Sequence, residues 1–154
     1  MRTFIAACCL MPSASVLATT SVPMATAQSA LQLRQLNDIS YVTGGIGSDE
    51  AAAMRQVARQ FNVRIHFVDS SDSSALSDVT VTLFNARREI VLLVLSEGPY
   101  LYMNLPRGNY RAVVRYGGIL VSRSITVKGD SAGVDLLLRL PTVPVGSDGL
   151  ITGR

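Results

Sequence analysis

The sequence is poor in the residues that bind zinc and form disulfide bonds. Its 154 residues contain one histidine, His66, and two cysteines, Cys8 and Cys9. These few side chains exclude a zinc site built from cysteine and histidine, and they exclude a disulfide framework. No apolar run outside the N-terminal segment approaches the roughly 20 residues that a membrane helix needs. We therefore expect no membrane span in the rest of the chain.

The overall composition is typical of a single globular domain. Apolar residues make up 48% of the chain and charged residues 16%, which argues against wholesale disorder. A length of 154 residues suits one domain. The formal net charge of +3 is spread along the chain and does not form the basic cluster of a nucleic-acid-binding protein. We therefore expect no nucleic-acid partner.

The first 27 residues have the features of a secretory signal peptide. One basic residue, Arg2, precedes an apolar run over residues 4–10, and the small residues Ala25 and Ala27 precede Gln28. This pattern predicts export and cleavage after Ala27. The mature protein would then be periplasmic or secreted. It would contain no cysteine, which suits an oxidising compartment.

Cys8 also ends a short segment that resembles a bacterial lipobox. The residues Ile5-Ala6-Ala7-Cys8 match that motif, but no apolar region precedes them. A lipid-anchored cysteine needs such a region ahead of it. We therefore do not expect a lipoprotein.

Residues 28–47 are predicted to lead into the fold. The segment 28–40 is polar, and we interpret it as a mobile lead-in or a short frayed segment. Gly44, Gly45 and Gly47 follow in a glycine-rich turn. A dinucleotide-binding loop also contains closely spaced glycines, but here Asp49 and Glu50 would repel a pyrophosphate. We therefore expect a turn and no nucleotide site.

A single helix is predicted over residues 48–61. Ser48 is a suitable N-cap, and Asp49 and Glu50 in the first turn favour the positive end of the helix dipole. Apolar residues then recur at helical spacing as far as Phe61. Two arginines, at 55 and 59, fall on the outer face.

After Phe61 the period of the apolar residues changes from 3.6 to 2, which indicates strands. Turn residues recur about every ten positions. The pattern predicts a mainly β protein, a seven-stranded antiparallel β-sandwich over residues 62–140 that is preceded by one short helix. Residues 141–154 are rich in proline and glycine and are predicted to form a flexible tail. The expected strands are 63–67, 79–83, 90–95, 100–105, 110–116, 119–127 and 134–140.

The run Ile90-Val91-Leu92-Leu93-Val94-Leu95 is the most apolar of these strands. An uncharged run of this kind suits a strand that is buried on both faces. We therefore predict a central or covered strand. The alternative is a sheet edge that pairs with a strand of a partner.

Three segments carry a resemblance to a known family. Residues 78–83, 98–102 and 105–111 resemble the carboxypeptidase regulatory-like domain, whose signature is an L-P-x-G-x-Y turn that enters a strand. The resemblance covers about residues 62–140 and implies a prealbumin-like sandwich without catalytic residues. The preceding segment 41–50 and its helix resemble the leader of small exported proteobacterial proteins, which implies an envelope setting.

The turn motif also has a direct physical interpretation. Pro106 fixes its φ for a turn, and Gly108 permits a positive φ. Tyr110 would enter the strand with its ring in the core, and its hydroxyl could bond to a turn carbonyl. This arrangement is similar to the tyrosine corner of other sandwiches. We therefore assign Pro106, Gly108 and Tyr110 a structural role.

Two groups of residues could form a chemical site, but neither matches the sequence pattern that such a site needs. A Ser-His-Asp triad would have to use His66, but alternation places it opposite Ile65 on a solvated face, and no G-x-S-x-G elbow is present. Asp69, Asp72 and Asp78 could suggest calcium, but their spacing does not fit an EF-hand loop. We expect a solvated histidine and a solvated loop, with weak calcium binding as the alternative for the loop.

A candidate interaction surface consists of arginines and a tyrosine. We predict that Arg64, Arg111 and Arg115 share an outer sheet face, which could meet a protein, a glycan or acidic lipid. Tyr100 shares one face of its strand with Tyr102, and the family resemblance favours an inward position for Tyr102. Exposed tyrosines could add to such a surface.

The sequence favours a non-catalytic exported β-sandwich without a cofactor, in a protein-interaction or accessory role in the bacterial cell envelope. Its partner would be another envelope protein. The alternative is a periplasmic protein that binds a small molecule or a glycan. An exposed strand edge would favour the first hypothesis, and a concave pocket lined by tyrosine and arginine the second. A buried His66 bonded to a carboxylate would favour an enzyme.

Overall fold

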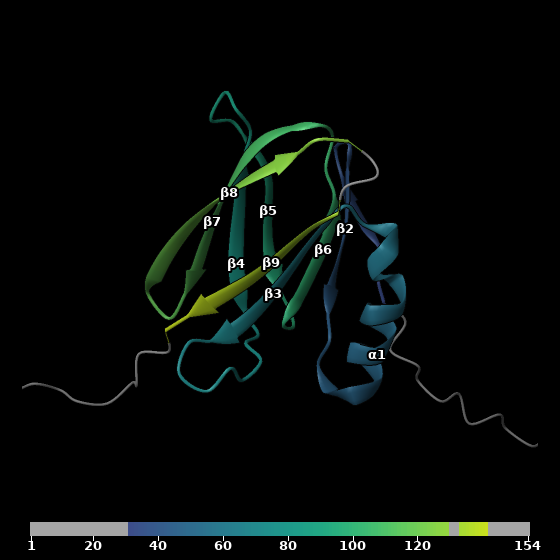
Figure 1. Ribbon diagram of the computed structural model, residues 1–154, viewed down its shortest axis with the longest axis vertical. Helices are drawn as coiled ribbons and strands as arrows, with labels where there is room; N and C mark the ends of the chain where they lie inside the picture. The colour runs from purple at the N-terminus through teal and green to yellow at the C-terminus, as the bar shows by residue number, and fades with distance from the viewer. Residues whose placement is uncertain (1–30, 130–132, 142–154) are drawn as a thin grey trace, which may run out of the picture.

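The computed structural model describes residues 31–129 and 133–141 (Figure 1). They form nine strands, one α-helix and one short 3-10 helix. The helices are α1 (Gly47–Val57) and η1 (Ala58–Gln60). The strands are β1 (Arg34–Leu36), β2 (Ile39–Gly44), β3 (Val63–Asp69), β4 (Val79–Phe84), β5 (Ile90–Ser96), β6 (Tyr100–Asn104), β7 (Gly108–Tyr116), β8 (Ile119–Val127) and β9 (Val134–Leu140).

The strands form two sheets. One has five strands in the order β1-β2-β6-β3-β9, and the other has four in the order β5-β4-β7-β8. All seven predicted strands are present, as β3 to β9. The prediction of purely antiparallel pairing is wrong, because β9 runs parallel to β3 and pairs Val63 with Val134. The chain reaches β9 from the other sheet rather than through a hairpin from β3, so the two strands can run in the same direction.

The predicted lead-in is part of the fold, and this is a second correction. Strand β2 pairs with β6, so that Tyr41 lies opposite Met103 and Val42 opposite Tyr102. Ile39 is only 4% exposed and belongs to the main core. The β-rich unit therefore begins at Arg34 rather than at residue 62. Strand β1 escaped prediction because it is a short edge strand with polar residues, and the sequence signal of such a strand is weak. Strand β2 escaped prediction because its residues span the boundary between the polar segment and the glycine-rich turn.

The main core lies between the two sheets. Each inner face contributes alternate residues of its strands, as the period of 2 predicts. The fully buried members include residues of both sheets, namely Val63, Ile65, Phe67, Leu101 and Met103 from one and Val81, Leu83, Leu92, Ala112 and Val114 from the other. Both sheets therefore bury one face against a shared core, which fixes which residues point outward.

Helix α1 covers part of the outer face of the five-stranded sheet (Figure 1). Met54 is fully buried there and packs in a second cluster with Val42, Phe61 and Tyr102. Tyr102 is thus buried, but beneath the helix instead of between the sheets. The inward position that the resemblance favours for Tyr102 is therefore wrong, because Leu101 and Met103 on the opposite side of the strand face the main core.

The start of α1 differs from the prediction. The helix begins at Gly47, and the preceding residue is Ile46, so Ser48 is not the N-cap. The backbone N–H of Ile46 instead donates to the carboxylate of Glu50 at 2.9 Å. Asp49 and Glu50 do lie in the first turn, as predicted. The carboxylate satisfies a free N–H and favours the positive end of the helix.

The predicted tyrosine corner is present. The Tyr110 hydroxyl donates to the carbonyl oxygen of Pro106 at 2.8 Å. Gly108 does not use the positive φ that a glycine permits, because it is not among the glycines with a positive φ. A Cβ at Gly108 would lie 3.5 Å from the Tyr110 ring, an ordinary contact distance. The glycine therefore begins β7 in an ordinary strand conformation.

Strand β5 is an edge strand and not the covered strand that we predicted. It pairs with β4 on one side and lies at the end of its sheet. Leu92 faces the core, whereas Leu93 and Leu95 are 58% and 51% exposed on the outer face. The run appeared doubly buried because its outward positions are also aliphatic.

The predicted signal peptide over residues 1–27 lies outside the described residues, as do residues 142–154 of the predicted tail over 141–154. Within residues 31–129 and 133–141, neither helix has the length and apolar character to cross a membrane.

Candidate functional site

The three candidate arginines do not share one face. Arg64 lies on β3 in the five-stranded sheet, whereas Arg111 and Arg115 lie on β7 in the four-stranded sheet. The two sheets turn their inner faces toward the same core, so their outer faces point in opposite directions. Alternation along a strand shows which residues share a side, but not to which sheet the strand belongs. The molecule therefore has two separate candidate surfaces.

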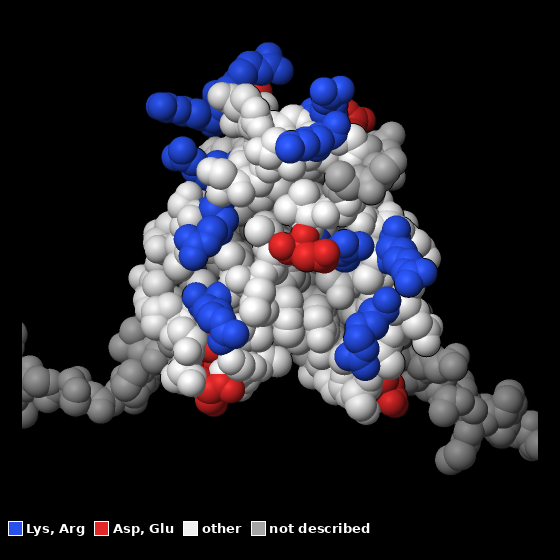
Figure 2. Space-filling view, in the orientation of Figure 1, with Lys and Arg blue, Asp and Glu red and all other residues white. Residues whose placement is uncertain are grey.

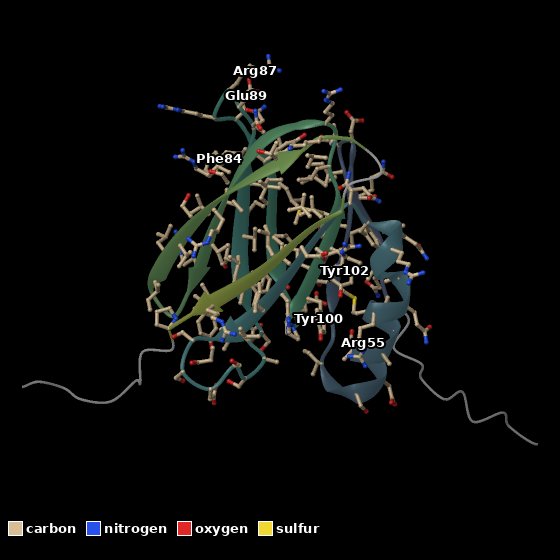
Figure 3. The ribbon with its side chains drawn as sticks, viewed as in Figure 1. Arg55, Phe84, Arg87, Glu89, Tyr100 and Tyr102 are labelled. Carbon is tan, nitrogen blue, oxygen red and sulfur yellow. The ribbon has the colours of Figure 1, made fainter. Side chains whose placement is uncertain are left out.

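The first surface contains an aromatic stack on the five-stranded sheet. His66 of β3 lies opposite Tyr100 of β6, and their rings stack with centroids 4.5 Å apart and planes at 20°. Tyr102 follows on the same face, 5.9 Å from Tyr100 between centroids. Figure 3 shows both tyrosines next to helix α1. The strand register thus places the single histidine of the chain within an aromatic cluster.

The glycine-rich turn makes room for this stack. Gly45 has a φ of +99°, and a Cβ built on it would lie 2.2 Å from Cδ2 of Tyr100. Gly44 and Gly47 also have positive φ values, as the predicted turn requires. The three glycines are therefore needed for the turn, and Gly45 also for close packing against Tyr100.

Burial determines the ionisation of the aromatic cluster. It lowers the pKa of His66, so the imidazole favours its neutral form. Burial also raises the pKa of Tyr102, with a smaller contribution from Tyr100. His66 is half-buried instead of solvated, but it faces away from the core as predicted. Within the described residues it has no hydrogen bond to a carboxylate.

An ion pair lies beside the aromatic cluster. The Arg64 guanidinium donates through Nη2 to Asp135 of β9 at 2.8 Å, and through Nη1 to the carbonyl oxygen of Ala58 at 3.3 Å. Arg64 lowers the pKa of Asp135 through this bond. A shallow hollow of about 250 Å³ lies among these groups and the aromatic rings. The pair joins β3, β9 and η1, and its first role is therefore structural.

The second surface is the outer face of the four-stranded sheet. Its outward residues include Arg111 and Arg115, and the four strands contain no acidic residue. Arg115 lies opposite Thr80 on one side and Leu120 on the other. Leu120 is 60% exposed, and Leu93 and Leu95 of β5 are 58% and 51% exposed. This face therefore combines positive charge with exposed apolar side chains.

A groove of about 660 Å³ lies at one end of this face. Phe84 ends β4 below the turn that carries Arg87 and Glu89 (Figure 3). The groove is lined by aromatic, aliphatic, amide, hydroxyl and guanidinium groups and by no carboxylate. The lining residues used below are Phe84, Arg88, Asn109, Tyr110, Arg111 and Val113.

A further groove of about 650 Å³ is mainly polar, and its two asparagine side chains are engaged within the fold. The Asn62 side chain donates to the carbonyl oxygen of Leu105 at 2.8 Å. The Asn104 side chain donates to the carbonyl oxygen of Gln60 at 3.0 Å. These amides join η1 to the end of β6 and are not free for a ligand.

The aspartates of the loop after β3 organise turns. The Asp69 carboxylate accepts from the backbone N–H of Ser71 at 2.6 Å, and Asp72 accepts from that of Ser74 at 2.8 Å. The second bond lowers the pKa of Asp72. Among the described residues, no three acidic, histidine or cysteine side chains gather in a way that could hold a metal ion.

Basic side chains are scattered over the face seen in Figure 2 rather than gathered in one patch.

Sequence reasoning missed the acid partner of Arg64, because Asp135 is 71 positions away. It also missed Phe84 and Arg88, which the β4–β5 turn brings to the groove.

A comparison of the chain with protein-family models and with curated proteins finds no match.

Proposed function

We propose that this chain is an exported, non-catalytic β-sandwich of the prealbumin type with a protein-interaction or accessory role in the bacterial envelope. The observation that carries the proposal is that β5, within the described residues, pairs along one side only. Its partner there is β4, and Leu93 and Leu95 are exposed on its outer face. An exposed edge is the feature that favours an interaction module over the alternatives.

The chemistry of β5 supports docking of a partner strand. Natural edge strands are usually protected from pairing by charge, proline or extreme shortness. Strand β5 has seven residues, none of them charged and none of them proline. The irregularity in its pairing lies at the Ile90 end and leaves the register regular from Leu92 to Ser96. An extended segment of a partner could therefore pair with this backbone, while the exposed leucines contribute apolar contacts.

The family resemblance supports the type of fold in this proposal. Two facing sheets and the bond from Tyr110 to Pro106 agree with a prealbumin-like sandwich that has an L-P-x-G-x-Y corner. The chain departs from the seven-stranded pattern by β1 and β2, which extend one sheet. Export rests on the signal pattern of residues 1–27, and the envelope setting follows from export and from the resemblance.

The groove beside Phe84 favours a second candidate function, the binding of a small molecule or glycan. Its lining includes Tyr110, Arg88 and Arg111, which is the combination expected of such a site. A volume of about 660 Å³ is within the usual range for small-molecule pockets. We rank this function second because the groove is wide and shallow, whereas the β5 edge is a preformed pairing surface.

A crosslinking experiment with matched variants tests the proposed function. The natively exported, C-terminally tagged protein is crosslinked in cells and purified, as the wild type, as the double variant Leu93→Lys with Leu95→Lys, and as Leu120→Lys. Leu120 is exposed on the same face but lies on β8. We expect one reproducible envelope partner with the wild type and Leu120→Lys, and its loss in the double variant. A partner that survives the double variant, or no partner, would contradict docking at β5.

A further inference from the structure

We propose that the groove at the turn end of the four-stranded sheet binds an anionic amphiphile. The anionic group would lie between Arg88 and Arg111, and the hydrocarbon chain would lie against Phe84 and Val113. This inference deepens the second candidate function by naming its ligand class. It does not depend on docking at the β5 edge.

The strand register places charge and apolar surface side by side. Arg111 of β7 lies directly opposite Phe84 of β4, and Val113 lies opposite Thr82 on the same outward face. Phe84 also lies opposite Ile90 of β5. A ligand with its anion on Arg111 therefore has Phe84 directly across on β4 and Val113 two residues further along β7, whereas the partner of Arg111 on β8 is the polar Ser124. Free inorganic anions would use only the charged half of this site.

A rigid turn supplies the second guanidinium. The side-chain oxygen of Asn85 accepts from the backbone N–H groups of Arg87 at 2.9 Å and Glu89 at 3.0 Å. Arg88 lies between them with a φ of +64°, so the turn holds its backbone in a defined direction. Both Arg88 and Arg111 line the groove. Arginine suits carboxylate and phosphate groups because its planar donors can bind two oxygens at once.

The charges of the groove are not neutralised from within. Neither Arg88 nor Arg111 forms an ion pair inside the described part of the chain. The nearest acid on the turn is Glu89, which is engaged by Arg87 at 3.5 Å and by the Asn85 amide at 2.6 Å. Asn109 accepts from Thr126 through its oxygen, which leaves its amide nitrogen as a further donor. An anion is therefore the ligand that this lining complements.

Apolar side chains extend from the groove along the sheet. Ile90 and Leu93 are 60% and 58% exposed and continue the surface formed by Phe84 and Val113. Covering such side chains with hydrocarbon removes apolar surface from water, and the gain grows with each methylene of the chain. A second copy packed face to face would instead oppose arginines to arginines on acid-free strands. The occupant is therefore an anionic amphiphile and not another copy of this protein.

Calorimetric titration of the purified exported protein tests the proposal with three probes. Decanoate has the anion and the chain, acetate has the anion alone, and 1-decanol has the chain alone. We expect decanoate to bind at least about tenfold more tightly than either control, since only decanoate uses both halves of the site. Equal binding of decanoate and 1-decanol would overturn the role of the arginines.

Matched variants locate the site. Arg111→Gln removes one guanidinium of the groove, and Arg115→Gln removes a guanidinium from the same strand and face but outside the groove. We expect the decanoate Kd to rise about tenfold in Arg111→Gln and to change less than about twofold in Arg115→Gln. Equal effects of the two changes would show nonspecific attraction and would overturn the proposal.

The source of the amphiphile is distinguished with vesicles. Phosphatidylglycerol vesicles present anionic amphiphiles in a bilayer, and phosphatidylcholine vesicles are the neutral control. If the protein binds decanoate but not the vesicles, and Arg111→Gln weakens this binding, the ligand is a free amphiphile. If it binds the anionic vesicles but not decanoate, and Arg111→Gln weakens that binding, the ligand is a membrane lipid. If neither probe shows binding that depends on Arg111, the proposal fails. The partner captured at β5 is measured separately, so either function can fail without the other.

Discussion

The ring of Tyr100 stacks on the imidazole of His66, with centroids 4.5 Å apart, and Gly45 leaves the space that the tyrosine ring occupies. A Cβ at Gly45 would lie 2.2 Å from that ring, and its φ of +99° is unfavourable for any other residue. The glycine-rich turn and the aromatic stack are therefore one structural unit. A substitution in the turn should therefore alter the position of the Tyr100 ring and the environment of His66.

Replacing Gly45 with alanine should destabilise the fold and displace Tyr100. We expect Gly45→Ala to lower the free energy of unfolding by about 3 kcal/mol, from backbone strain and overpacking together. Gly47→Ala is the matched control, because Gly47 also has a positive φ but no atom within 4 Å of its Cβ position. It should cost about 1 kcal/mol. Urea denaturation measures both, and equal losses would contradict the packing role of Gly45.

The stability of the protein should fall on mild acidification because of His66. Burial holds the pKa of folded His66 below its usual 6.5, so the unfolded chain takes up the proton first as pH falls. The free energy of unfolding is then constant well above pH 6.5 and decreases below it, with a slope of at most about 1.4 kcal/mol per pH unit. Urea denaturation at pH 7.5 and 5.5 measures the decrease.

The variant His66→Phe is the control for this pH dependence. It keeps a ring against Tyr100 but removes the only imidazole of the chain. Its free energy of unfolding should change little between pH 7.5 and 5.5, because carboxylates titrate mainly at lower pH. An equal decrease in the variant would show that another group is responsible.

Removing the Tyr110 hydroxyl should loosen the corner that begins β7. The hydroxyl bonds to the Pro106 carbonyl, and a typical hydrogen bond contributes about 1 kcal/mol. We expect Tyr110→Phe to lose about that much stability in thermal unfolding. Tyr116→Phe on the same strand should lose less, because no hydrogen bond of its hydroxyl is present within the described residues. The reverse order would be inconsistent with a tyrosine corner.

A lysine on the inner face of β5 should destabilise the fold, whereas a lysine on the outer face should leave its stability nearly unchanged. Leu92 is fully buried in the core, and its neighbour Leu93 is 58% exposed. Leu92→Lys should cost more than about 3 kcal/mol, whereas Leu93→Lys should stay within about 0.5 kcal/mol of the wild type. Chemical denaturation of the two variants provides the comparison. A large loss in Leu93→Lys would mean that the outer face is covered in solution.

Much of the fold can be predicted from the sequence because strand periodicity is a local property. Residues 110–116 alternate clearly, and the spacing from Pro106 to Tyr110 already indicates the corner. Strand β1 is not predicted because three mostly polar residues carry little periodic signal. Strand β2 is not predicted because its apolar residues merge into the glycine-rich turn. A local pattern also does not show where a strand lies in its sheet. For this reason the aliphatic run of β5 predicts a covered strand although β5 lies at the sheet edge.

The candidate sites could be predicted only in part. Arg64 and Arg111 were expected on one face, but alternation cannot assign strands to sheets. The ion pair of Arg64 with Asp135 depends on a parallel pairing of distant strands, which no local pattern reveals. The groove depends on how a turn presents Arg88 beside Phe84, and this is set by hydrogen bonds of Asn85.

Site-specific photo-crosslinking in cells tests the central claim most directly. A photoreactive amino acid replaces Leu93 or Leu95 at the β5 edge, or Gln56 on the exposed side of α1 as the control. We expect the two β5 positions to crosslink to the same envelope protein and position 56 to give no crosslink to it. Crosslinking to that protein from position 56 alone, or equal crosslinking from all three positions, would contradict docking at the β5 edge.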